Sequence, residues 1–137
     1  MRKQLMTLAA VTFAAAAPLV LASAGTAAAA ENVINWSAQQ GDATASGTRW
    51  TEKSASGVTW LVAKGELVNA SPGCVSMKIS ETHDFLSKTT TVATQCGPGT
   101  SPVGYRAPRR QLMSYIDLYL CEGDQDTRDC KRAKETR

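Results

Sequence analysis

The sequence CVSMKISETHDFLSKTTTVATQC, residues 74–96, decides the fold. Its first half alternates apolar and polar residues from Val75 to Ile79, which is the period of a strand that is buried on one face. The β-branched run over 89–94 suits a second strand with a solvated face. A polar loop over 81–88 joins them, and a cysteine stands at each outer end. The stretch therefore predicts a β-hairpin that a disulfide closes at its mouth.

The chain has four cysteines, an even number that allows three pairings. We expect Cys74 to pair with Cys96, and Cys121 with Cys130, because both bonds close short local loops and neither crosses the other. Zinc ligands typically stand about two to four residues apart. Here 21, 24 and 8 residues separate successive cysteines, and His83 is the one histidine. Two disulfides therefore fit better than a metal site, and they indicate an oxidising destination.

Residues 1–30 have the layout of a secretory signal peptide. Arg2 and Lys3 form a positive start, an apolar run follows from Leu5 to Leu21, and small residues end at Ala30. We expect cleavage after Ala30 and release of the remaining chain, with no membrane attachment afterwards. The predicted location is extracellular.

The remaining chain is predicted to hold one domain, residues 31–130, followed by a basic, flexible tail at 131–137. Cleavage removes Arg2 and Lys3 but no acidic residue, so the formal net charge falls from +3 to +1. Such a small excess does not favour a nucleic-acid partner.

The rest of the sequence predicts short strands and turns. The pattern A-S-G-x-x-W occurs at 45–50 and again at 55–60, which indicates two adjacent strands that each place a tryptophan. Further strands are expected at 31–40, at 58–69 with a bulge near Gly65, and at 112–121. No segment has helical periodicity, so we expect an all-β fold, a small antiparallel β-sandwich of five to seven strands stabilised by two disulfides.

This layout resembles the small secreted two-disulfide β proteins of actinobacteria. The shared features are the Ala-rich leader, a strand with Gly65-Glu66-Leu67, and a last cysteine pair that begins in the final strand at Tyr119-Leu120-Cys121. The resemblance implies an exported β domain and supplies no catalytic residues.

Two clusters suggest chemistry, and each has a simpler interpretation. A small hydrolase would use His83 with a nearby serine, or with Glu81 and either Arg109 or Arg110. A loop histidine beside Asp84 is more often only solvated. The acidic loop Glu122–Asp129 offers carboxylates for calcium, but it lacks the EF-hand glycine and final glutamate, so a solvated turn is favoured.

Two surfaces suggest binding. Tyr115, Asp117 and Tyr119 share one strand face, and with Trp50, the tryptophan expected to be exposed, they form a candidate surface for sugar rings or a peptide. Packing of these aromatic residues within the sandwich is the simpler interpretation, and it is favoured. The segment Gly97–Pro108 is expected to be a long proline-rich loop, which a protease inhibitor could present as bait around Arg106.

The favoured prediction is a secreted, non-catalytic binding module without a cofactor or metal. The sequence does not identify its partner, and the candidates are a cell-envelope glycan and another secreted protein. The alternatives are an inhibitor that acts through Gly97–Pro108 and a hydrolase that uses His83.

Overall fold

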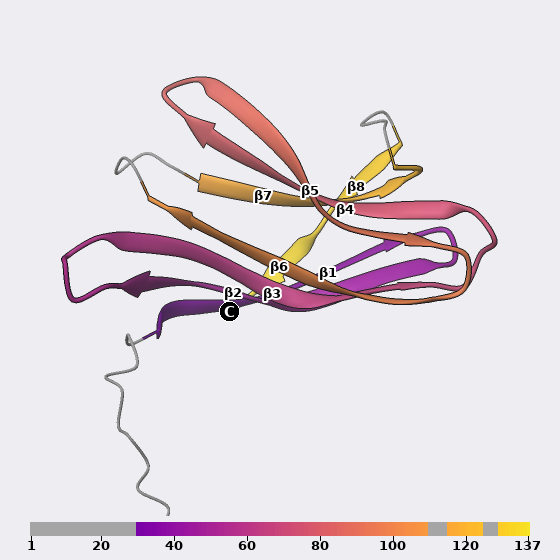
Figure 1. The fold of residues 1–137 in the computed structure, drawn as a ribbon, viewed down its shortest axis with the longest axis horizontal. Helices are drawn as coiled ribbons and strands as arrows, with labels where there is room; N and C mark the ends of the chain where they lie inside the picture. The colour runs from indigo at the N-terminus through magenta and orange to yellow at the C-terminus, as the bar shows by residue number, and fades with distance from the viewer. Residues whose placement is uncertain (1–29, 110–114, 125–128) are drawn as a thin grey trace, which may run out of the picture.

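The computed structural model describes residues 30–109, 115–124 and 129–137. These residues form nine antiparallel strands in two sheets (Figure 1). The strands are β1 (Ala30–Gln40), β2 (Ala43–Lys53), β3 (Thr59–Asn69), β4 (Cys74–His83), β5 (Leu86–Cys96), β6 (Gly99–Pro108), β7 (Tyr115–Glu122), β8 (Cys130–Arg132) and β9 (Lys134–Thr136). The first sheet has the order β6-β3-β2-β1-β9 and the second has the order β5-β4-β7-β8. The predicted all-β, two-layer fold is confirmed, although with more strands than the five to seven expected.

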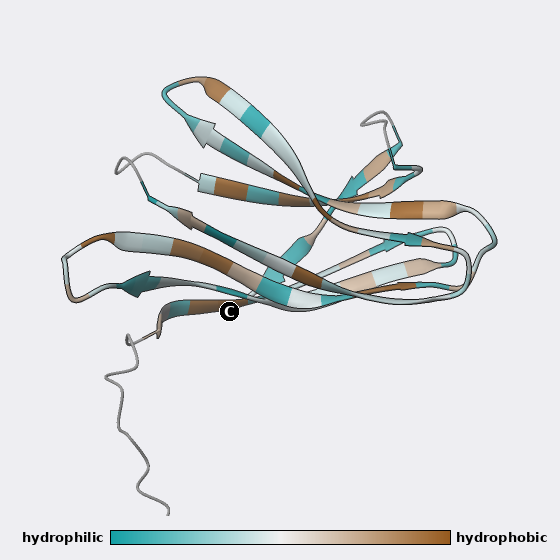
Figure 2. Ribbon diagram, in the orientation of Figure 1, coloured by the Kyte–Doolittle hydropathy of each residue, from teal (hydrophilic) through white to brown (hydrophobic). Residues whose placement is uncertain are grey.

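The core lies between the two sheets. Apolar and polar residues alternate along parts of the strands (Figure 2), as in β7, where Ile116, Leu118 and Leu120 are buried. Such alternation places the apolar side chains of a strand on one face of its sheet. The largest buried side chains come from both layers, and they are Trp36, Leu67, Met77, Ile79, Leu118 and Leu120. Within the described residues, no helix is long and apolar enough to cross a membrane.

Both predicted disulfides are present, Cys74–Cys96 and Cys121–Cys130, and no cysteine is free. Cys74 and Cys96 face each other at the open end of the β4–β5 hairpin. Cys121 and Cys130 join β7 to β8. Each bond therefore closes a pair of neighbouring strands, as the spacing indicates.

The predicted bulge near Gly65 is wrong, because β2 and β3 pair without a shift from Ala43 to Lys53. Gly65 lies directly opposite Gly47, and a Cβ built on either glycine would come within 2.7 Å of Cζ2 of Trp36. The paired glycines therefore leave room for the indole ring of β1 across the inner face of the sheet.

The predicted loop at Gly97–Pro108 is also wrong. Gly99 to Pro108 forms β6, which pairs with β3 along its whole length. β6 is the edge strand of its sheet, where a proline costs less because one side of the strand has no partner. No protruding bait loop is formed there, since Arg106 lies within this strand.

The basic tail is ordered, contrary to the prediction of a flexible end. Cys130–Arg132 pairs with β7, and Lys134–Thr136 pairs with β1 in the other sheet. Ala133 between them is buried, and its N–H donates to the carbonyl of Leu118 at 2.8 Å. The end of the chain thus crosses from one sheet to the other.

Candidate functional site

The second sheet presents a polar surface on the side that faces away from the core. Met77 and Ile79 point inward, so the residues that alternate with them along β4 point outward. Cross-strand pairing extends this outer side into three rows. The rows are Ser87–Thr82–Tyr115, Thr89–Ser80–Asp117 and Thr91–Lys78–Tyr119–Arg132. We call these ten residues the hydroxyl face, because most of them carry a hydroxyl group.

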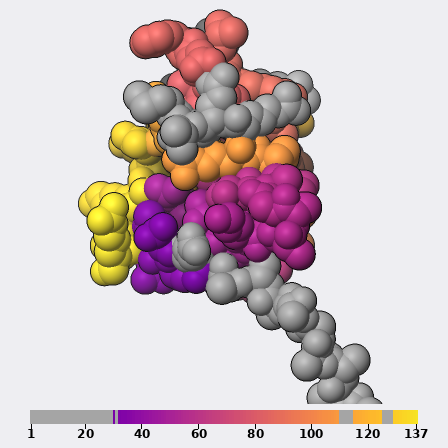
Figure 3. All heavy atoms as spheres, turned by 90° about the vertical axis from the view of Figure 1, so that its left-hand side faces the viewer, coloured from indigo at the N-terminus to yellow at the C-terminus, as the bar shows by residue number. Residues whose placement is uncertain are grey.

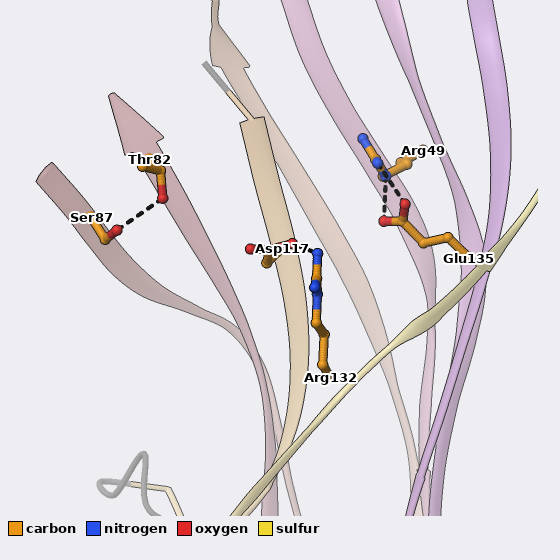
Figure 4. A network of polar contacts seen from close by, with 6 residues as sticks. All are labelled: Arg49, Thr82, Ser87, Asp117, Arg132 and Glu135. Carbon is orange, nitrogen blue, oxygen red and sulfur yellow. Dashed lines mark hydrogen bonds and ion pairs between the residues drawn. The ribbon is translucent and has the colours of Figure 1, made fainter. Parts of the chain in front are cut away.

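Two polar contacts fix parts of the hydroxyl face (Figure 4). The hydroxyls of Thr82 and Ser87 lie 2.8 Å apart across β4 and β5. A guanidinium nitrogen of Arg132 donates to the carboxylate of Asp117, and this hydrogen bond raises the pKa of Arg132. The sequence could not assign this partner to Asp117, because the tail that carries Arg132 was expected to be free.

The two tyrosines and the lysine of this face differ in exposure. Tyr115 is 55% exposed at the start of β7, whereas Tyr119 is half-buried. Lys78 is only 4% exposed. It lines a pocket of about 260 Å³ together with Ser80, Thr89, Tyr119 and the disulfide Cys121–Cys130. The sequence analysis did not single out Lys78; a cation between Met77 and Ile79 in a central strand was the available signal.

Trp50 does not join this surface. It lies on β2, in the other sheet, where its indole N–H donates to the Glu52 carboxylate at 2.9 Å. The guanidinium of Arg106 stacks 3.8 Å above the Trp60 ring and lies 3.6 Å from the same carboxylate. Val62 beneath them is buried. Of the predicted binding residues, the structure therefore brings together Tyr115, Asp117 and Tyr119, and it separates Trp50 from them.

A second polar cluster lies on the inner side of β4, at the end of the sandwich. One oxygen of Glu81 lies 2.5 Å from Nε2 of His83, and the other accepts a hydrogen bond of 2.8 Å from the Tyr105 hydroxyl. Burial, and then the hydrogen bond and charge of Glu81, raise the pKa of Tyr105 well above its usual value. These three residues line a pocket of about 360 Å³ with Lys88. Sequence reasoning missed Tyr105, because its partner lies in the other sheet.

The serine hydrolase arrangement does not form. Ser80 and Ser87 belong to the outer side of the second sheet, whereas His83 hydrogen-bonds to Glu81 on the inner side. Ser76 donates to the carbonyl of Gly123 at 2.8 Å. Arg109 does not line the His83 pocket, and Arg110 lies outside the described residues. Of the predicted catalytic group, the described residues therefore bring together Glu81 and His83.

The proposed calcium loop cannot be followed in full. Residues 125–128 lie outside the described part of the chain, while its two ends are tied by the N–H of Glu122, which donates to the Asp129 carbonyl at 3.0 Å. The described residues contain no group of three or more histidines, cysteines or carboxylates that could hold a metal ion.

The tip of the β4–β5 hairpin projects from the body (Figure 3). Asp84 and Phe85 form the turn, and both have positive φ angles, of 44° and 71°. Such angles suit turns of this kind but are unusual for residues with a bulky side chain. Phe85 and Leu86 are exposed there. The loop predicted over 81–88 is therefore a two-residue turn, and His83 belongs to a strand.

Comparisons of the chain with protein-family models, with curated proteins and with solved structures returned no match.

Proposed function

We propose that the protein is a secreted, non-catalytic binding module that holds a glycan on its hydroxyl face. Export is supported by the two disulfides and by the absence of a free cysteine, both of which suit an oxidising environment. The glycan is supported by the chemistry of the surface that the second sheet presents.

The observation that carries the proposal is the combination of Tyr115 and Tyr119 with the serine and threonine hydroxyls on one side of the sheet. A sugar offers apolar C–H faces, which pack on an aromatic ring, and hydroxyls, which exchange hydrogen bonds with protein hydroxyls. The two tyrosines are four residues apart on β7, about 13 Å at the usual rise of a strand. A chain of several sugar rings could therefore contact both.

The test is retention on insoluble polysaccharides, with β-glucan, chitin and peptidoglycan as probes. Tyr115→Ala should weaken binding about tenfold, which corresponds to losing one stacking contact. The control is Val68→Ala, because Val68 is an exposed residue of β3 in the other sheet. The proposal fails if none of the probes retains the wild-type protein, or if both variants bind equally well.

A hydrolase is a second candidate, because Glu81, His83 and Tyr105 meet in a pocket that also contains Lys88. A carboxylate beside an imidazole can serve as an acid–base pair, and a nearby lysine can neutralise a phosphate. The simpler function of this cluster is to join the two sheets through the bond from Tyr105 to Glu81.

Hydrolysis of single-stranded RNA and of a synthetic phosphodiester would test this second candidate. An enzyme should lose at least about 100-fold in rate in His83→Ala and in Glu81→Gln, while Val68→Ala keeps its rate. Wild-type rates that equal those of His83→Ala would remove the candidate and leave the cluster with its structural role.

A further inference from the structure

Lys78 is placed where a charged side chain is seldom found. It lies in the central strand β4 of the second sheet, opposite Thr91 on one side and Tyr119 on the other. Lys78 is only 4% exposed, although its side chain belongs to the outer side of the sheet. An ammonium group that leaves water loses a large hydration free energy unless protein or ligand groups replace that water. The position of Lys78 therefore needs an explanation.

The contacts of Lys78 replace little of this hydration. Its Nζ donates to one acceptor, the backbone carbonyl of Asp124, at 3.3 Å. Among the described residues no carboxylate lies within ion-pair distance of Lys78, and Asp117 in the next row is bound by Arg132. An ammonium has three N–H donors, so the positive charge and most of its donors have no partner among the described residues.

The pocket beside Lys78 supplies further donors. Three of the residues that line it with Lys78 carry hydroxyls, and they are Ser80, Thr89 and Tyr119. Its volume of about 260 Å³ is several times the volume of about 30 Å³ that one water molecule occupies in the liquid, so the pocket can hold a group larger than a water molecule. Its surroundings therefore combine one cation, three hydroxyls and room for part of a ligand.

We infer that this pocket holds an anionic group, a carboxylate or a phosphate, carried by the ligand. A lysine acts as a point charge with rotatable donors, so it accepts either group, and the hydroxyls bind the remaining oxygens. The inference depends on the proposed function, because it specifies an acidic glycan for the hydroxyl face. Lys78, Ser80, Thr89 and Tyr119 all belong to that face, so the pocket lies within the proposed glycan surface.

Calorimetry with soluble oligosaccharides of equal length tests the inference. A uronic-acid oligosaccharide, a phosphorylated one and a neutral one serve as probes, so that the carboxylate and phosphate sources are compared directly. We expect at least one acidic probe to bind the wild type about tenfold or more tightly than the neutral probe, and Lys78→Met to remove this preference. Lys53→Met is the control, because it removes the same charge from an exposed position at the end of β2.

Thermal unfolding provides an independent measurement. Phosphate in place of chloride at equal ionic strength should raise the melting temperature of the wild type more than that of Lys78→Met, since exclusion of phosphate from protein surfaces stabilises both proteins and the bound anion adds to this in the wild type alone. The variant is expected to fold, because methionine has a similar length and removes an unpaired buried charge.

The possible failures can be separated. Equal binding of neutral and acidic probes by the wild type overturns the anion site but leaves the glycan function. Retention of the acidic preference in Lys78→Met also overturns it. A phosphate effect that depends on Lys78, without binding of any oligosaccharide, supports the anion site and contradicts the glycan function.

Discussion

At the scale of single residues, Trp36 shows how two glycines, Gly47 and Gly65, make room for a large side chain in the core. The indole ring is 2% exposed and lies against Gly47 and Gly65, which face each other on β2 and β3. A Cβ on Gly65 would lie 2.1 Å from the carbonyl oxygen of Ser46, a distance that neither backbone can accept without moving. Both glycines are therefore required by space.

Gly65→Ala should consequently destabilise the fold by about 3 kcal/mol or more, the upper range of overpacking. Gly104→Ala is the matched control, since a Cβ there meets nothing within 4 Å and its strand is the neighbouring β6. Chemical denaturation monitored by tryptophan fluorescence measures both. Equal stability of the two variants would show that Trp36 can move away at little cost.

Individual residues also show which contacts could be predicted from the sequence and which could not. The cysteine pairs could be predicted because their loops are local. The contact of Lys78 with Asp124 and the bond from Tyr105 to Glu81 could not, because both depend on which distant segments become neighbours. Tyr115, Asp117 and Tyr119 were found together because they share one strand, and Trp50 was misplaced because it belongs to another.

At the scale of elements, local amino-acid composition led to two wrong predictions, a loop in place of β6 and a flexible tail in place of β8 and β9. Pro102 and Pro108 made β6 resemble a loop, but an edge strand tolerates residues that cannot donate a backbone hydrogen bond. The tail after Cys130 is basic and short, yet it forms β8 and β9. Its one apolar residue, Ala133, was the available sign that it turns inward.

The last strand gives a test at this scale. Two nitrogens of Arg49 donate to the two carboxylate oxygens of Glu135, each at 2.7 Å, across β1 (Figure 4). Deleting residues 134–137 should lower the free energy of unfolding by about 2–3 kcal/mol, because it removes strand hydrogen bonds as well as this ion pair.

Glu135→Gln is the control for the deletion. It keeps the strand and weakens only a partly exposed ion pair, so it should cost about 1 kcal/mol or less. Urea denaturation separates the two variants. If the deletion costs no more than the substitution, β9 contributes little and the tail behaves as the sequence suggested.

At the scale of the whole molecule, the two-layer architecture follows from the alternating pattern and the absence of helical periodicity. The order of the strands does not, because it is fixed by contacts between segments far apart in the chain. Trp50 and Tyr119 could be assigned to strands, but not to opposite sheets. The division of the predicted aromatic surface is thus a consequence of topology.

In the first sheet β3 pairs with β6, although β4 and β5 of the other sheet lie between them in the sequence. Asn69 at the end of β3 pairs with Gly99 at the start of β6, and the intervening residues make the β4–β5 hairpin of the other sheet. The N–H of Gly97 donates to the carbonyl of Gly73 at 3.0 Å, so the two ends of the β4–β5 hairpin lie side by side where the chain enters and leaves it. The side chain of Asn69 donates to the carbonyls of both Gly73 and Gly97 there. The β4–β5 hairpin is thus inserted into the connection between β3 and β6, so its sequence or length can change while β3 and β6 keep their pairing.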